Sequence, residues 1–184
     1  MTRAFTAIRF TPDETFKQAF QQLKNQLKDE KINWVTPDNL HLTLQFLGEI
    51  NRNEINTLKR VFKLINFVTP FTMQMAGIHL FGNLKNPRLL YTEIQAGPEL
   101  FDLVRVTDGK LNEINLYSRD KKFKPHITLG RIKFIKDSER FEEILSYSQK
   151  NFFQQTVCSE FILYESILKP SGPDYIPLEK FRLE

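Results

Sequence analysis

The stretch HLTLQFLG (41–48) has a near copy in HITLGRIK (126–133). Both begin with histidine, an apolar residue, threonine and leucine, although the 184-residue chain has only three histidines. The two copies start 85 residues apart (126 − 41), which is close to half of the chain length. A strand and a helix precede the pattern in each half, so the spacing suggests a duplicated unit that supplies one copy per half.

Each copy has the alternation of a β-strand. Residues two apart in a strand point to the same face. His41 and Thr43 should therefore share one face, with the intervening leucines on the other, and His126 and Thr128 should repeat this arrangement. Two such strands facing one cleft would bring two imidazoles and two hydroxyls around a small volume.

This set of side chains suits an in-line displacement at phosphorus. Such a reaction needs a base for the nucleophile and an acid for the leaving oxygen. Two histidines with pKa values near 6.5 can divide these roles, and threonine hydroxyls can donate to the non-bridging oxygens. Neither a metal nor a cofactor is required, and we expect none. For one copy alone, a satisfied surface histidine is the more common outcome; the repeat favours chemistry. His79, in GIHLFG (77–82), lacks the following threonine and is expected to be structural.

The chain as a whole predicts an α+β fold with seven to eight strands and four helices. Thr11 and Pro12 mark the start of the first helix as its N-cap and first position. The expected strands are 3–10, 39–48, 71–82, 88–95, 126–134, 157–168 and 175–183. The expected helices are 13–30, one after Asn51, one from Pro98 with an interruption at 107–109, and 137–149.

Net charge, cysteine content and hydropathy limit the partners and the compartment that we expect for this protein. The net charge of +4 and a pI near 9.1 suit a polyanionic partner without demanding one. The single cysteine, Cys158, excludes an internal disulfide and is expected to be inert core. No apolar run reaches the ~18 residues of a membrane span. We therefore expect a monomeric cytoplasmic protein that binds no membrane.

The segments RAFTAI (3–8), NLHLTLQFLGEI (39–50), KPHITLGRIK (124–133) and SGPDYIPLEKFRL (171–183) together resemble the 2H phosphoesterases, a superfamily named for two His-x-Thr-x motifs. The chain is most similar to the branch of RNA 2′,3′-cyclic phosphodiesterases, also called 2′-5′ RNA ligases. The resemblance covers nearly the whole chain, and the paired motifs are more specific for the superfamily than for the substrate.

The resemblance implies a single 2H phosphoesterase domain over residues 1–184. Its fold would be bilobal, with two antiparallel sheets and flanking helices related by a pseudo-twofold axis, and with one motif in each lobe. The implied reaction is metal-free hydrolysis of a terminal 2′,3′-cyclic phosphate to a 2′-phosphate. The implied partner is RNA with such an end, including tRNA fragments.

The resemblance also assigns roles to residues. His41, Thr43, His126 and Thr128 match the catalytic quartet, with His41 as proton donor and His126 as proton acceptor; the residues themselves do not decide this order. Two further residues, each five after its histidine, match substrate-binding positions.

Arg131 matches a basic residue near the phosphate. Phe46 matches a position that is aromatic in some members and can stack on a base. Strict alternation places both on the core face, opposite the histidines, unless the strands bulge near Gly48 and Gly130. For Phe46 the alternative is core packing.

Three alternatives stay open. The chain could act as a 2′-5′ RNA ligase, hydrolyse small cyclic nucleotides, or bind RNA ends without catalysis. Both motifs are intact, so nothing in the sequence favours the non-catalytic alternative. Turnover of a cyclic-phosphate dinucleotide would separate an enzyme from a protein that only binds RNA ends.

Overall fold

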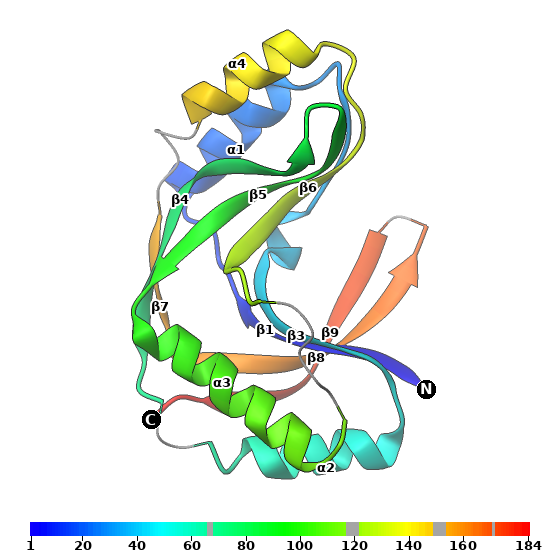
Figure 1. The fold of residues 1–184 in the computed structure, drawn as a ribbon, viewed down its shortest axis with the longest axis vertical. Helices are drawn as coiled ribbons and strands as arrows, with labels where there is room; N and C mark the ends of the chain where they lie inside the picture. Colours follow the sequence, from blue (N-terminus) through cyan, green and yellow to red (C-terminus); the bar gives the residue numbers. More distant parts are fainter. Residues whose placement is uncertain (66–67, 117–121, 149–153, 171) are drawn as a thin grey trace.

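The computed structural model describes residues 1–65, 68–116, 122–148, 154–170 and 172–184. It confirms the α+β class: within these ranges lie nine strands and four α-helices (Figure 1). The strands are β1 (Thr2–Arg9), β2 (Lys31–Trp34), β3 (His41–Ile50), β4 (Phe71–Asn83), β5 (Asn86–Ala96), β6 (His126–Phe134), β7 (Gln155–Cys158), β8 (Glu160–Lys169) and β9 (Gly172–Arg182). The helices are α1 (Glu14–Gln26), α2 (Arg52–Phe62), α3 (Pro98–Glu113) and α4 (Ser138–Ser148), with a 3₁₀ turn at Pro37–Asn39.

The strands form one curled antiparallel sheet in the order β7-β4-β5-β6-β3-β1-β8-β9, with β2 added on β6. Its centre is the junction of the two motif strands. Among the described residues, Leu42 and Ile127 form the one register pair that joins β3 to β6. On either side lies a more fully paired antiparallel half-sheet. We call β3, β1, β8 and β9 the His41 half, and β6, β5, β4, β7 and β2 the His126 half.

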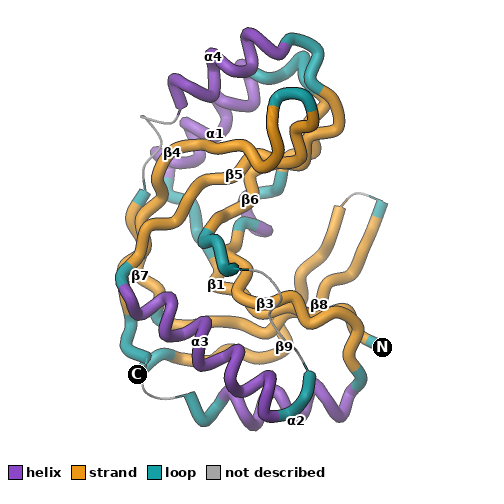
Figure 2. The backbone as a smooth tube through the Cα atoms, in the orientation of Figure 1, coloured by secondary structure: helices purple, strands orange, loops and turns teal. Residues whose placement is uncertain are grey.

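Helices α1 and α3 each cover the half-sheet that does not contain the strand preceding them in the chain (Figures 1 and 2). Helix α1 follows β1 of the His41 half, yet Phe20 of α1 packs edge-on against Trp34 of β2, with ring centroids 5.6 Å apart. Helix α3 follows β5 of the His126 half, yet Thr107 of α3 accepts a hydrogen bond from Gln45 of β3. Each half-sheet is therefore covered by a helix whose preceding strand belongs to the other half, as a pseudo-twofold relation requires.

The remaining helices stay with the strands they support. Phe62 of α2 packs edge-on against Phe161 of β8 and Phe181 of β9, at 5.5 and 5.4 Å between ring centroids. Helix α4 contacts β4 of the His126 half. Helices α2 and α3 thus cover the His41 half, while α1 and α4 cover the His126 half. Among the described residues, the α-helices leave the opposite face of the sheet open (Figure 2).

The motif strands are anchored through their apolar residues. Leu42, Leu44, Ile127 and Leu129 are each at most 2% exposed. Burying one such side chain is worth about 1.5–3 kcal/mol, so these residues fix which face of each strand points to the core. The other face is then forced outward, and it carries the histidines and threonines.

Several details differ from the sequence prediction. Asp13, not Thr11, caps α1: its carboxylate accepts from the amide of Phe16 at 2.7 Å. The helix also ends at Gln26 instead of 30, because the following segment forms β2, a strand that the sequence pattern did not predict. Helix α3 runs unbroken through 107–109.

At the C-terminal end, the predicted strand 157–168 is two strands, β7 and β8. Residue 149, the predicted end of α4, and Ser171, the first residue of the closing segment, lie outside the described residues. In the described part of the chain, every helix is too short or too polar to cross a bilayer.

Candidate active site

The two motif strands present their side chains in the same way. The pattern of exposure along the first nine residues of β3 is repeated residue for residue in β6. His41, Thr43, His126 and Thr128 are all half-buried, between fully buried apolar neighbours. Because the strands are antiparallel about the Leu42–Ile127 pair, the four side chains lie on one face, around the centre of the sheet.

Each histidine is oriented by the same backbone contact. Nδ1 of His41 donates to the carbonyl of Asn39 at 2.6 Å, and Nδ1 of His126 donates to the carbonyl of Lys124 at 2.7 Å. A carbonyl can only accept, so Nδ1 carries a hydrogen in both rings. In the neutral ring Nε2 then holds the lone pair, and in the protonated ring Nε2 is the acid. Both imidazoles are thus held with the reactive nitrogen free of any partner among the described residues.

Phe46 and Arg131 lie on the same face as the histidines, which corrects the strict-alternation expectation. Phe46 is 68% exposed and Arg131 is also exposed. The reason is a β-bulge in each strand. On β1 the register jumps between the partners of Thr43 and Gln45, and on β5 it jumps between those of Thr128 and Gly130.

Each bulge leaves two consecutive buried residues, Leu44 with Gln45 and Leu129 with Gly130. The extra residue shifts the alternation by one and turns the next side chain to the open face. The sequence allows for a bulge near Gly130, and β6 has one there. In β3 the decisive bulge lies three residues before Gly48. Phe46 is therefore not core packing.

Burial lowers the pKa of both histidines below the ordinary value of 6.5. The carbonyl contact at Nδ1 opposes this in each case, because it favours a proton on the ring. The positive charges of His126 and Arg131 lower the pKa of His41 further, and the charge of Lys124 does the same for His126. Arg131, although on β6, therefore acts across the sheet centre on the histidine of β3.

Aromatic rings flank both histidines. His41 lies 5.1 Å from Phe5 and 5.1 Å from Tyr175, between ring centroids. On the other half, His126 lies edge-on to Phe81 at 4.9 Å and to Tyr91 at 5.6 Å. Such walls restrict the rings to the orientation that the backbone contacts set, and they exclude water from their flanks.

Lys124 completes the wall of the His126 half. Its Nζ donates to the hydroxyl of Tyr91 at 2.7 Å and lies 4.8 Å from the ring centroid of Phe81. A cation held two residues before His126 is well placed to attract an anion. Sequence reasoning missed this lysine, although the signal was its position in KPHITLGRIK (124–133).

The third histidine lies outside this arrangement. His79 is on β4, where its Nε2 donates to the carbonyl of Ala76 at 3.0 Å. Its ring lies 5.5 Å from that of Tyr91, between centroids, and Tyr91 in turn flanks His126. The nitrogen that serves as acid or base in the other two histidines is thus occupied here.

The described residues give little support to a metal centre or to a cysteine nucleophile. They contain no group of three histidine, cysteine, aspartate or glutamate side chains that could hold a metal ion. The thiol of Cys158 is buried, and burial raises its pKa to about 12. A thiol with that pKa is protonated at neutral pH and is a poor nucleophile, as expected for inert core.

The comparisons with known proteins agree with this geometry. A family model described as LigT like Phosphoesterase matches residues 10–91, which include the first motif. The RNA 2′,3′-cyclic phosphodiesterase of Archaeoglobus fulgidus is 31% identical over 97% of this chain and 99% of its own length. The chain belongs to the LigT-like phosphoesterases. The corresponding protein of Thermus thermophilus is 32% identical over 98% of this chain and 90% of its own length.

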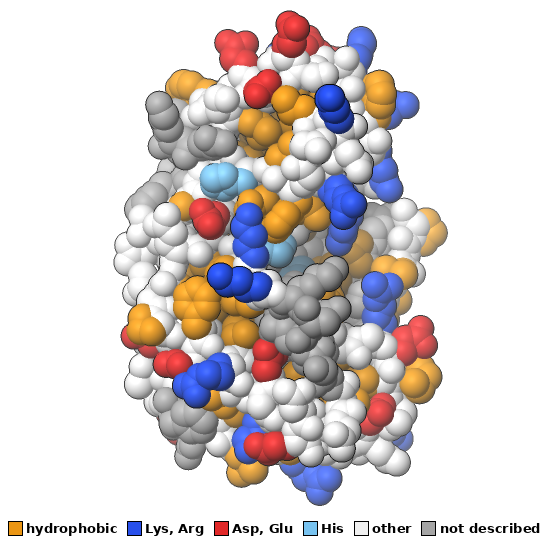
Figure 3. All heavy atoms as spheres, viewed as in Figure 1, with side chains coloured by type: hydrophobic (Ala, Val, Ile, Leu, Met, Phe, Trp, Pro, Cys, Tyr) orange, Lys and Arg blue, Asp and Glu red, His pale blue; other side chains and the backbone are white. Residues whose placement is uncertain are grey.

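A solved structure has a similar fold. The crystal structure of TT0787 of Thermus thermophilus matches with a TM-score of 0.78 and 27% identity, covering 98% of this chain and 97% of that one. In this LigT-like chain both motifs are complete and face one hollow. Figure 3 shows histidine atoms in the hollowed middle of the displayed face, with lysine and arginine side chains gathered around it.

Proposed function

We propose that this protein is an RNA 2′,3′-cyclic phosphodiesterase, which opens a terminal cyclic phosphate to a 2′-phosphate. The observation that carries this proposal is the paired tethering of the two histidines. Both rings face one hollow with Nδ1 fixed to a carbonyl and Nε2 presented. The names of relatives that match along nearly the whole chain support the RNA cyclic phosphate as the substrate.

The two histidines divide the proton transfers. Nε2 of His126 takes a proton from water as the water oxygen bonds to phosphorus. Nε2 of His41, protonated, gives its proton to the 3′ oxygen as the bond from phosphorus to that oxygen breaks. Entering and leaving oxygens stand on opposite sides of phosphorus, so each half of the sheet serves one side. The protons balance, and the 2′ oxygen keeps the phosphate.

The remaining site residues bind the substrate. Thr43 and Thr128 donate their hydroxyls to the non-bridging oxygens, where negative charge resides in the transition state. Arg131 balances the charge of the phosphate from the exposed end of the bulge. Phe46 offers a ring that is 68% exposed, on which the terminal base stacks.

The whole chain acts as one catalytic domain, with one motif per lobe. The exchange of α1 and α3 between the halves supports this, because neither half-sheet is covered by its own helices alone. A single chain supplies both motifs, so the active form is a monomer. Its substrates are cyclic-phosphate-ended RNAs, including tRNA fragments, and the buried thiol fits a reducing compartment such as the cytoplasm.

The reaction proceeds without a metal, because acid, base and charge stabilisation all come from side chains. The test is to incubate RNA with a 2′,3′-cyclic phosphate end and the protein in excess chelator, then to identify the product end. A 2′-phosphate is expected. Loss of turnover that a divalent ion restores would overturn the metal-free mechanism.

Product identity tests the orientation of the substrate separately. A 3′-phosphate product would mean that the 2′ oxygen leaves, so the substrate would lie in the opposite sense. Binding of the RNA end with no product of either kind would favour the non-catalytic alternative. Adding RNA with a 5′-hydroxyl to the same assay measures the ligase direction.

A further inference from the structure

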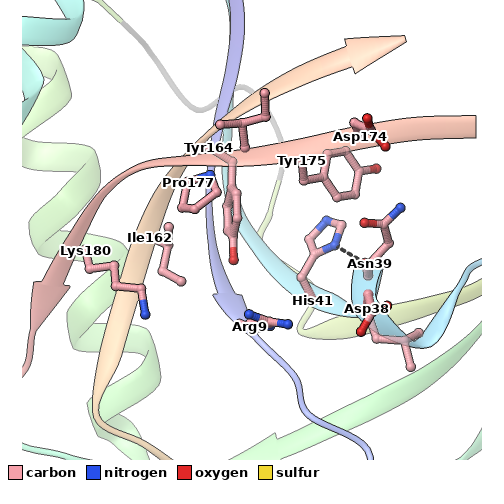
Figure 4. Close-up of a pocket in the computed structure, with 12 residues that line it drawn as sticks. Arg9, Asp38, Asn39, His41, Ile162, Tyr164, Asp174, Tyr175, Pro177 and Lys180 are labelled. Carbon is pink, nitrogen blue, oxygen red and sulfur yellow. Dashed lines mark hydrogen bonds between the residues drawn. The ribbon is translucent and has the colours of Figure 1, made fainter. Parts of the chain in front are cut away.

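A pocket of about 320 Å³ adjoins the catalytic centre on the His41 half (Figure 4). It is lined by residues of β1, β8 and β9 and of the turn before β3, among them Arg9, His41, Ile162, Tyr164, Tyr175 and Lys180. Its volume falls at the lower end of the range for small-ligand sites, about the size for a nucleotide unit. The role proposed above for His41 does not use this pocket.

The pocket is distinct from the phosphate site. His41 lines both, but Thr43, His126, Thr128 and Arg131 do not line the pocket. Tyr175 forms the boundary, because its ring stands edge-on to His41 at 5.1 Å. The pocket therefore extends away from the reacting phosphorus, on the side that His41 serves.

Part of its wall is apolar and aromatic. Tyr164 is 7% exposed and stacks on Phe5, with ring centroids 5.2 Å apart. Ile162 is 1% exposed and forms part of the floor between β1 and β9. This part of the wall offers a surface on which a sugar or base can pack.

Two cations line the pocket: Arg9 lies beside His41, and Lys180 lies on the side opposite Tyr175 (Figure 4). Arg9 is the register partner of His41 on the neighbouring strand, and it has no ion pair within the described residues. Lys180 pairs with Glu160 at 3.1 Å, and both side chains are partly exposed, so the pair can exchange for an anion. Two aspartates also line the pocket, and one of them, Asp174, is paired with Lys169.

We propose that this pocket binds the RNA strand on the 5′ side of the terminal nucleoside, with the first internucleotide phosphodiester at Arg9 and Lys180. The inference rests on the proposed function. If His41 protonates the 3′ oxygen, the ribose that carries the cyclic phosphate lies on the His41 side of phosphorus. The strand attached to that ribose then has the pocket beside it. The pocket makes the protein prefer an RNA end over a cyclic mononucleotide.

The experiment compares kcat/KM for three substrates with the same terminal nucleoside. These are the nucleoside 2′,3′-cyclic phosphate, the dinucleotide with that end, and the same dinucleotide with an uncharged methylphosphonate linkage. We expect the dinucleotide to exceed the mononucleotide roughly tenfold to hundredfold, as a charge-assisted contact allows. The methylphosphonate should lose most of this preference, and this arm needs no variant of the protein.

Arg9→Gln and Lys180→Gln should each lower the dinucleotide-to-mononucleotide ratio toward that of the methylphosphonate. Arg60→Gln, an exposed arginine on α2 outside the pocket, is the matched control and should keep the ratio. Equal kcat/KM for all three substrates, or a ratio that both pocket variants leave unchanged, would overturn the subsite while hydrolysis stands. Absence of hydrolysis of the mononucleotide and the dinucleotide alike would overturn the proposed function and the subsite with it.

Discussion

The two motif strands share a backbone design and differ in the residues that succeed the His-x-Thr-Leu pattern. Both β3 and β6 tether their histidine to the carbonyl two residues earlier, and both bulge directly after the pattern. At the bulge, however, β3 has Gln45 where β6 has Gly130. One residue later, β3 exposes an aromatic ring and β6 exposes a guanidinium.

The bulge residue of β3 is part of a buried polar network. Gln45 is 1% exposed, and its Nε2 donates to the hydroxyl of Thr107 at 2.6 Å and to the carboxylate of Asp108 at 3.0 Å. Thr6 donates to its side-chain oxygen. This network attaches α3 to the catalytic strand. A buried amide is tolerated here because both of its polar atoms have partners.

The bulge residue of β6 instead makes room for a neighbour. A Cβ at Gly130 would lie 2.7 Å from Cγ2 of Ile32 and 3.0 Å from Cε3 of Trp34. Strand β2 therefore packs directly on the bulge, and no equivalent strand covers β3 within the described residues. The two halves thus share the tethered histidine and differ in what supports the bulge and in the side chain exposed after it, an aromatic ring in β3 and a guanidinium in β6.

Removing either histidine should have the largest effect. His41→Ala and His126→Ala should each lower kcat by about 10²–10⁴-fold, because general acid or base catalysis is lost. Both side chains are half-buried at the hollow, so the melting temperature should change little. His79→Ala is the control and should keep most activity. Equal loss in all three variants would show that the shared tether does not mark the catalytic pair.

Removing the hydroxyls should have a smaller effect that is similar in the two halves. Thr43→Ala and Thr128→Ala should each cost about 1.5–3 kcal/mol of transition-state stabilisation, the value of a hydrogen bond to a charged group. Thr→Ser at each position keeps the hydroxyl and should restore most of the rate. Steady-state kinetics of the four variants measures this. A loss confined to one half would mean that only one threonine contacts the phosphoryl oxygens.

The packing of β2 on the bulge of β6 can be tested through the stability of the protein. Gly130→Ala should lower the free energy of unfolding by about 1–3 kcal/mol, because the new methyl group overlaps Ile32 and Trp34. Gly109→Ala is the matched control: it lies inside α3 with nothing within 4 Å of its Cβ position, so it should raise stability by about 0.5–1 kcal/mol. Urea unfolding measures both. If Gly130→Ala is neutral, β2 does not pack tightly on the bulge.

The bulges also mark the limit of what the sequence predicts. The period-2 pattern locates the motif strands and the face of each histidine correctly, since burial of leucine decides it. It places Phe46 and Arg131 on the wrong face, because a bulge depends on the partner strand and leaves no local pattern. Strand β2 was missed for a similar reason: KINW (31–34) is short and pairs with a strand about 100 residues away. The pocket at Arg9 involves β1, β8 and β9, which only the fold brings together.

The smallest expected effect is in the pH dependence, and it tests whether the halves act on each other. The productive free protein has one histidine protonated and one neutral, a state most populated between the two apparent pKa values of the pair. Burial lowers both pKa values below 6.5, so kcat/KM should be bell-shaped with its optimum below pH 6.5 and should fall toward neutral pH. A bound phosphate favours the protonated ring, so the profile of kcat should lie at higher pH. Arg131→Gln removes a positive charge that lowers the pKa of His41, so one limb of kcat/KM should move to higher pH. A kcat/KM optimum above pH 7 would contradict the lowering of the two pKa values. Limbs that Arg131→Gln leaves in place would show that Arg131 of β6 does not influence the histidine of β3.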